Sequence, residues 1–242
     1  MMRREHRGWI RRALISVLLV LRAGAATAQY DEPGEYVSSE ARFFSAGAIY
    51  RDFAPSAGNP TPDSLAIRYK AWMPTLAFDQ GPFEVMFGYT RYVLNGSSRE
   101  AIFLGTTVST DVLLAGSRSN ALLAPVCGAA DFTKSESDGA ERDHFNVASL
   151  GIGSGLKYRS VSPSMEFSIQ ALGIIHYSFE GFSTGSGSST AVLGDARLLL
   201  RHIRLLDGLV CGYRFRYQRW SLSNANANYQ TISHGPYLGV LF

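Results

Sequence analysis

Hydrophobic and polar residues alternate along the chain from about residue 42 to its last residue. The clearest stretch is 83–94, where Phe83, Val85 and Phe87 share one face and Glu84 lies on the other. Strict alternation of this kind predicts β-strands, because successive side chains of a strand point to opposite faces. We expect strands near residues 42–53, 64–78, 83–94, 100–114, 120–133, 145–158, 163–179, 190–204, 209–221 and 231–242.

The expected strands are long enough to cross a membrane. A tilted spanning strand needs about 9–11 residues, whereas no run after residue 28 approaches the ~20 apolar residues of a spanning helix. A membrane protein without such helices must be a closed barrel, because hydrocarbon offers no partner to unpaired backbone groups. The fold class predicted for residues 42–242 is therefore an all-β, transmembrane antiparallel up-and-down β-barrel of about ten strands. The strand count would be eight or twelve if one hairpin merges or splits. The alternative fold is a secreted β-sandwich or a soluble periplasmic barrel.

The connections between the strands alternate in length, as expected of a barrel whose two chain termini both lie in the periplasm. Short turns are expected at 79–82, 116–120, 160–163 and 206–208, and longer loops at 54–63, 95–99, 135–144, 181–190 and 223–230. The loop at 95–99 is hardly longer than a turn. In the first strand, the adjacent Phe43 and Phe44 leave the inward face undecided.

The first 28 residues have the three regions of a cleavable signal peptide. Arginines crowd the start, an apolar run occupies 13–21, and Ala26, Thr27 and Ala28 form a cleavage box. Residues 1–28 carry a net charge of +5, so their removal changes the whole-chain charge of +3 to −2. The basic balance belongs to the discarded segment, and we expect no nucleic-acid partner. Residues 29–41 are expected to form a short periplasmic segment before the barrel.

The last strand carries a family resemblance. Pro236, Leu238, Val240 and the terminal Phe242 share one face at period two. A final strand that ends on Phe resembles the ends of bacterial outer-membrane β-barrels, in which it closes the barrel against the first strand. The resemblance implies an outer-membrane location, outer-membrane lipid and lipopolysaccharide as surroundings, and the barrel assembly machinery as a partner that reads this strand. A monomer is expected.

The cysteines and histidines predict neither a disulfide nor a metal site. The alternation places Cys127 inside the barrel and Cys211 outside it, on strands that are not neighbours, so the two sulfur atoms cannot meet. The histidines of the mature chain are scattered and match no zinc-ligand spacing. We expect no metal and no cofactor.

Polar residues at inward positions are the first candidate for function. The alternation places these in the lumen: Arg68, Lys70, Glu84, Asp111, Glu166, Gln170, His176, Asp195, Arg197, Arg214 and Arg216. In a narrow barrel such residues pair with one another and fill the interior. The alternative is a narrow polar passage or a ligand cavity.

One stretch near the end of the chain resembles an enzyme. The residues from Tyr213 to Asn226 and the closing strand are similar to the tail of the outer-membrane lipid A deacylases, which carry a His, one residue, then Ser-Asn. Here Ser223 and Asn224 match the Ser-Asn pair, but Ser221 stands at the position of the catalytic base. A hydroxyl cannot act as general base near neutral pH, which leaves His234 on the next strand as the substitute.

The sequence thus predicts a non-enzymatic outer-membrane barrel with a structural, surface-binding or narrow-pore role. The alternative is a lipid A deacylase-like hydrolase, with Ser223 as nucleophile and His234 as base, or an inactive relative of that family.

Overall fold

The structure is a computed structural model, and it describes residues 41–57, 59–60, 66–94, 96–117, 119–136, 145–180, 185–203, 206–223 and 228–242. The expected signal peptide (1–28) and nearly all of the expected periplasmic segment (29–41) lie outside the described residues. Within these ranges, no helix has the length and apolar character needed to cross a membrane.

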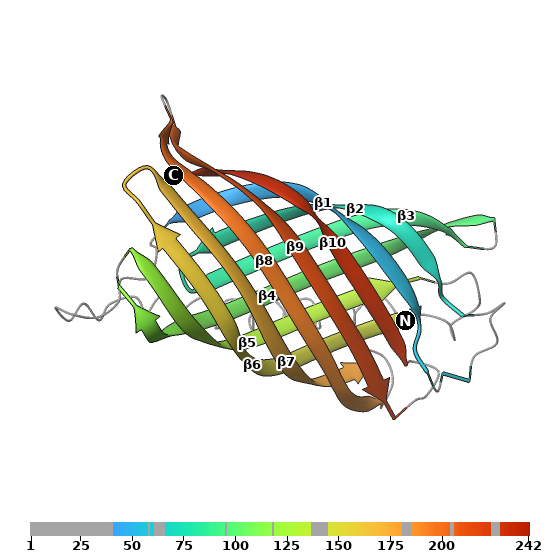
Figure 1. The fold of residues 1–242 in the computed structure, drawn as a ribbon. Coiled ribbons are helices and arrows are strands. Elements are labelled where there is room, and N and C mark those ends of the chain that lie inside the picture. Colours follow the sequence, from blue (N-terminus) through green and yellow to red (C-terminus); the bar gives the residue numbers. More distant parts are fainter. Residues whose placement is uncertain are drawn as a thin grey trace, which may run out of the picture. The chain divides into compact units, whose positions relative to one another are not determined.

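Ten antiparallel strands form one closed ring (Figure 1). They are β1 (Arg42–Pro55), β2 (Tyr69–Gln80), β3 (Phe83–Leu94), β4 (Ser97–Gly116), β5 (Asn120–Ser135), β6 (Phe145–Val161), β7 (Met165–Glu180), β8 (Ser186–Ile203), β9 (Leu206–Leu222) and β10 (Tyr229–Leu241). Each strand pairs with its neighbours in the sequence, and β1 pairs with β10. The predicted up-and-down barrel of ten strands is confirmed, in place of eight or twelve.

The first and last strands close the ring as the sequence predicts. Their register runs from Phe43 opposite Leu241 to Pro55 opposite Tyr229. At the end of this pair, the amide of Phe242 donates a hydrogen bond to the carbonyl of Arg42 at 3.1 Å. Every strand therefore has two neighbours, and the sheet has no free edge.

We call the end of the barrel where β1 begins and β10 ends the terminal end, and the opposite end the loop end.

Two connections differ from those expected. The predicted loop at 95–99 is a connection of two residues, because Ser97 already pairs with Leu94. Residues 206–208, expected to form the last short turn, belong to β9, and Leu206 pairs with Ile203 of β8.

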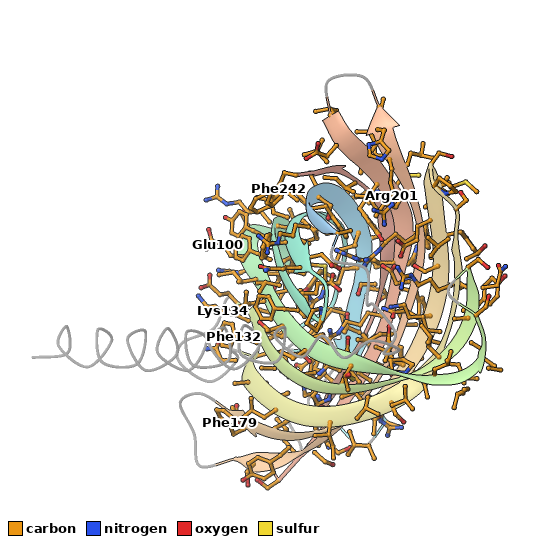
Figure 2. The ribbon with its side chains drawn as sticks, turned by 90° about the vertical axis from the view of Figure 1, so that its left-hand side faces the viewer. Glu100, Phe132, Lys134, Phe179, Arg201 and Phe242 are labelled. Carbon is orange, nitrogen blue, oxygen red and sulfur yellow. The ribbon has the colours of Figure 1, made fainter. Side chains whose placement is uncertain are left out.

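The two faces of the sheet differ in character, as the alternation predicts. In β1, Phe43 is fully buried inside the ring, whereas Phe44 points outward and is 57% exposed. Outward positions elsewhere hold large apolar residues such as Ile152 at 77% and Leu238 at 69% exposure. Figure 2 shows side chains projecting both into the ring and away from it. An exposed apolar surface of this extent is typical of contact with lipid.

Apolar side chains close the loop end of the interior. We name the following group the loop-end plug: Ile49, Phe53, Ile67, Tyr69, Met73, Tyr92, Ala101, Phe103, Phe145, Val147, Trp220, Leu222 and Tyr229. Phe53 stacks between the rings of Tyr69 and Tyr229, with centroids 5.3 and 4.9 Å away. Trp220 meets Phe145 edge to face at 5.1 Å. The plug joins residues from strands far apart in the sequence.

The two faces of β9 give a stability prediction. Phe215 points outward near the middle of the strand and is 40% exposed. In the bilayer, Phe215→Arg is expected to lower the free energy of unfolding by about 2–4 kcal/mol, because a charge near the midplane faces hydrocarbon. The control Gln230→Arg, outward at the loop end of β10, should cost no more than about 1 kcal/mol. Reversible unfolding in lipid vesicles measures both values, and equal small effects would contradict the assigned faces.

Candidate functional site

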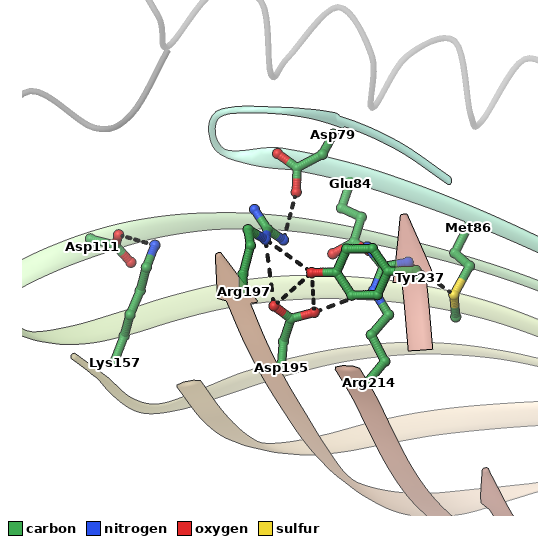
Figure 3. Close-up of polar contacts among 9 residues, drawn as sticks. All are labelled: Asp79, Glu84, Met86, Asp111, Lys157, Asp195, Arg197, Arg214 and Tyr237. Carbon is green, nitrogen blue, oxygen red and sulfur yellow. Dashed lines mark hydrogen bonds and ion pairs between the residues drawn. The ribbon is translucent and has the colours of Figure 1, made fainter. Parts of the chain in front are cut away.

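An ion-pair network crosses the interior toward the terminal end (Figure 3). Arg197 of β8 lies 3.0 Å from Asp79 of β2 and 3.5 Å from Asp195 of its own strand. Arg214 of β9 lies 3.3 Å from Asp195 and 2.6 Å from Glu84 of β3. The network thus ties β8 and β9 to the facing strands β2 and β3. Its side chains lie on the inward face and reach across the lumen at this level.

Aromatic rings complete this terminal-end network. Tyr237 of β10 donates its hydroxyl hydrogen to Asp195 at 3.1 Å, and its oxygen accepts a hydrogen bond from Arg197 at 3.2 Å. The guanidinium of Arg214 lies 4.2 Å above the Tyr237 ring. Gly212 makes room for this ring, since a Cβ atom there would lie 2.4 Å from the Tyr237 hydroxyl. The guanidinium of Arg197 lies 4.8 Å above the Phe43 ring, so each cation is bound at its edge by acids and on its face by an aromatic ring.

Two further ion-pair groups line the wall formed by β4 to β8. Glu166 accepts hydrogen bonds from Arg159 at 2.9 Å and from Arg201 at 3.0 Å, so that one carboxylate serves two guanidinium groups. Lys157 of β6 lies 2.8 Å from Asp111 of β4, across the intervening strand β5. All five side chains are on the inward face, and they extend the charged lining around the ring.

A third network lies between the loop-end plug and the terminal-end network. Asp131 of β5 accepts a short hydrogen bond from Arg216 of β9, and its Oδ2 lies 3.1 Å from Nε2 of His176. Arg216 also donates to Gln218 at 2.7 Å. The Gln218 amide donates to the Ser189 hydroxyl at 3.3 Å, and the hydroxyls of Ser178 and Ser149 continue this chain along the wall. This central network spans the barrel from β5 to β9.

Arg51 of β1 faces the central network. Its side chain is 2% exposed, and its guanidinium lies 5.8 Å from the centroid of Phe53 and 5.5 Å from that of Phe103. Its Nε and Nη2 atoms have no hydrogen-bond partner among the described residues. The space that Arg51, Phe103, Arg216, Gln218, Thr231 and Ser233 enclose has no room for a water molecule. These side chains therefore pack closely against one another.

The structure places most of the predicted lumen residues on the inward face. They are Glu84, Asp111, Glu166, Gln170, His176, Asp195, Arg197, Arg214 and Arg216. Arg216 pairs with Asp131, which is also inward by alternation but is not among the predicted lumen residues. Asp79 was missed because the sequence assigned it to a turn, whereas it is the penultimate residue of β2. Arg197 was predicted to lie in the lumen, but its pairing with Asp79 could not be identified without the register.

Two of the predicted lumen residues need correction. The side chain of Lys70 is 66% exposed and lies 3.0 Å from Asp52 on the outer face. Arg68 is exposed and precedes β2, which begins at Tyr69. The inward face of β2 holds the odd-numbered residues, such as Tyr69 and Met73. The prediction was wrong because it assigned the even-numbered residues of this strand to the inward face, which exchanges the two faces.

The predicted pair of Ser223 and His234 is not brought together. Ser223 follows β9, and its hydroxyl accepts a hydrogen bond from the Ser186 amide at 3.2 Å. His234 lies on the outer face in the middle of β10, opposite Phe215, and its Nδ1 is 2.6 Å from the Tyr213 hydroxyl. Eight residues separate Phe215 from Ser223, a distance of roughly 26 Å along a strand. His234 therefore cannot act as base for Ser223, and Asn224 lies outside the described residues.

The described part of the chain offers no metal centre. No three of its His, Cys, Asp and Glu side chains are grouped to hold an ion. Cys127 is buried inside β5, whereas Cys211 lies on the opposite face of β9, so the two thiols point to different sides of the sheet.

The central network gives a double-mutant prediction. Arg216→Gln leaves the buried Asp131 without its guanidinium partner, and the expected loss of unfolding free energy is about 3–5 kcal/mol. Adding Asp131→Asn should recover part of this loss, because the uncompensated charge is removed. The control Arg91→Gln breaks an exposed pair with Glu100 on the outer face and should cost less than about 1 kcal/mol. Equal losses in Arg216→Gln and Arg91→Gln would contradict a buried network.

Comparison with known proteins shows a likeness of architecture only. No protein family and no curated protein matches the chain. Among solved structures, neisserial surface protein A is 10% identical over 83% of this chain and 97% of its own, with a TM-score of 0.32. The translocator domain of the autotransporter NalP from Neisseria meningitidis is 11% identical over 96% and 98%, with a TM-score of 0.38. The outer membrane protease OmpT from Escherichia coli is 7% identical over 87% and 99%, with a TM-score of 0.39. These outer-membrane β-barrel proteins differ from one another in role, so the likeness assigns no activity to this chain.

Proposed function

We propose that the protein is a monomeric barrel of the bacterial outer membrane whose interior is occupied by its own side chains. Its role is then structural or surface-binding. The observation that carries the proposal is the stack of three layers of contacting side chains inside the ring: the loop-end plug, the central network and the terminal-end network.

The loop-end plug supports a closed lumen. Phe53 is fully buried and Trp220 is 1% exposed, although both lie close to the loop end of the barrel. Tyr69 also stacks on Tyr92 at 4.1 Å, which extends the plug toward β3. Moving one of these rings aside exposes a buried aromatic side chain, whose removal from such a core typically costs about 3–5 kcal/mol.

The charged layers support the same proposal. An ion that passes through the barrel must separate Arg216 from Asp131 and then Arg197 from Asp79, each of which is a buried pair. Separating a buried pair leaves two uncompensated charges in a low-dielectric environment. A narrow pore is therefore the less favoured role.

The outer surface supports placement in a membrane. Exposed apolar side chains cover the outward face, and charged pairs appear on it toward the loop end, where Asp52 meets Lys70 and Arg91 meets Glu100. In the proposed orientation both termini face the periplasm, and these pairs lie at the level of the lipopolysaccharide head groups. Cleavage after Ala28 and recognition of the last strand by the barrel assembly machinery belong to the same proposal.

The hydrolase alternative has less support. The resembled family has its catalytic base two residues before the Ser-Asn pair, and this chain has Ser221 there. The Ser223 hydroxyl accepts a hydrogen bond from a backbone amide. A serine hydroxyl without a neighbouring base is a weak nucleophile. The described residues therefore favour a non-enzymatic barrel.

Conductance in planar lipid bilayers tests the closed lumen. We expect no steady ionic current through the folded parent protein, because all three layers are filled. Trp220→Ala opens the plug and should increase the frequency of transient current steps. The matched control Trp72→Ala removes a tryptophan that is 57% exposed on the outer face and should behave as the parent does. A stable current through the unmodified protein would contradict the proposal.

A further inference from the structure

A furrow runs over the outer surface where the ring closes. Its volume is about 490 Å3, within the roughly 300–1,000 Å3 of typical ligand pockets. Its lining comes from four adjacent strands: Phe44, Ser45 and Ala46 of β1, Leu76, Ala77 and Phe78 of β2, Val85 and Phe87 of β3, and Leu238, Gly239 and Val240 of β10. The furrow is thus a feature of the junction between the two ends of the sheet, not of one hairpin.

The register explains why the surface is hollow here. Ala46 lies between Leu238 on one side and Leu76 on the other, and all three side chains point outward. The methyl group of Ala46 cannot reach the height of the two leucines. The outward face therefore has a low floor along β1 and apolar walls on β10 and β2.

The two ends of the furrow differ in chemistry. Toward the terminal end, Phe44 packs on Phe78 at 5.1 Å and on Phe242 at 5.2 Å. Phe242 is labelled beside β1 in Figure 2. One step further along the same face of β1, Arg42 is exposed at the rim of the barrel. A cation therefore stands at the terminal end of an apolar furrow.

Beyond the opposite end of the furrow, the same outward face carries amphipathic rings. Tyr50 meets Trp72 edge to face at 5.6 Å, and the ring of His234 lies 5.9 Å from Tyr50. Tyr213 reaches the same His234 through its hydroxyl. The furrow therefore lies between this aromatic row and Arg42, within an apolar stretch of the outward face.

We propose that the furrow binds one acyl chain of a phospholipid whose phosphate contacts Arg42. This inference rests on the proposed membrane location, and it places the lipid in the leaflet at the terminal end. The apolar lining matches a hydrocarbon chain, and the exposed guanidinium matches an anionic phosphate. A narrow chain fits a concave furrow, whereas the convex wall of a second barrel would rest on the flanking leucines and leave the floor empty.

Native mass spectrometry of the protein, extracted from outer membranes in mild detergent, tests the proposal. We expect a fraction of the parent protein to retain one phospholipid. Ala46→Phe fills the furrow and should lower this fraction roughly tenfold. The matched control Val126→Phe adds the same ring to the outward face of β5, away from the closing pair, and should leave the fraction unchanged. Arg42→Gln should lower it roughly fivefold, as expected from the loss of one cation near an anionic head group.

Other results would contradict the proposal, and each points to a different explanation. Equal retention in Ala46→Phe and Val126→Phe would show ordinary lipid carry-over. A dimer without phospholipid that Ala46→Phe abolishes would assign the furrow to a second copy of the chain. Retention of a single fatty acid, unaffected by Arg42→Gln, would show that no head-group phosphate contacts Arg42. If Ala46→Phe does not assemble, Leu238→Trp fills the furrow from its β10 wall. Recovery of the parent protein as a soluble periplasmic species would instead overturn the membrane location.

Discussion

Closure of the sheet between β1 and β10 is the constraint on which the rest of the structure depends. Hydrocarbon offers no hydrogen-bond partner to a strand edge, so a sheet in the membrane must satisfy every strand on both sides. The register from Phe43 to Pro55 achieves this. Closure also creates two surfaces with opposite requirements: the outer one must be apolar, and the narrow inner one must fill its volume with groups that satisfy one another.

The inner surface meets this requirement by pairing charges from strands that face one another across the ring. Asp79 with Arg197 and Asp131 with Arg216 are each formed by strands that are not neighbours. Such pairs hold opposite walls together, and a missing partner would leave a buried charge. Arg51 departs from the pattern, because it lies against the rings of Phe53 and Phe103 and its Nε and Nη2 have no partner among the described residues. It stands where the charged interior meets the apolar plug.

The sequence alone predicts the ten strands and most of their faces, because alternation at period two is a local signal. It fails where phase or register decides. Lys70 was placed inside because the even-numbered residues of β2 were assigned to the inward face, and a phase error of one residue exchanges the faces. His234 was paired with Ser223 because adjacent strands suggest proximity, whereas the register puts His234 opposite Phe215. The pairing of Asp131 with Arg216 spans four strands and could only come from the closed ring.

Reactivity of Cys127 tests the filled interior most directly. This thiol is 3% exposed on the inward face of β5, and Cys211 is the second cysteine of the chain. In a Cys211→Ser variant folded into lipid vesicles, a charged, water-soluble methanethiosulfonate reagent should not modify Cys127 until the barrel is unfolded. Rapid modification of the folded protein would show an interior open to water, and would contradict a lumen filled by the protein's own side chains.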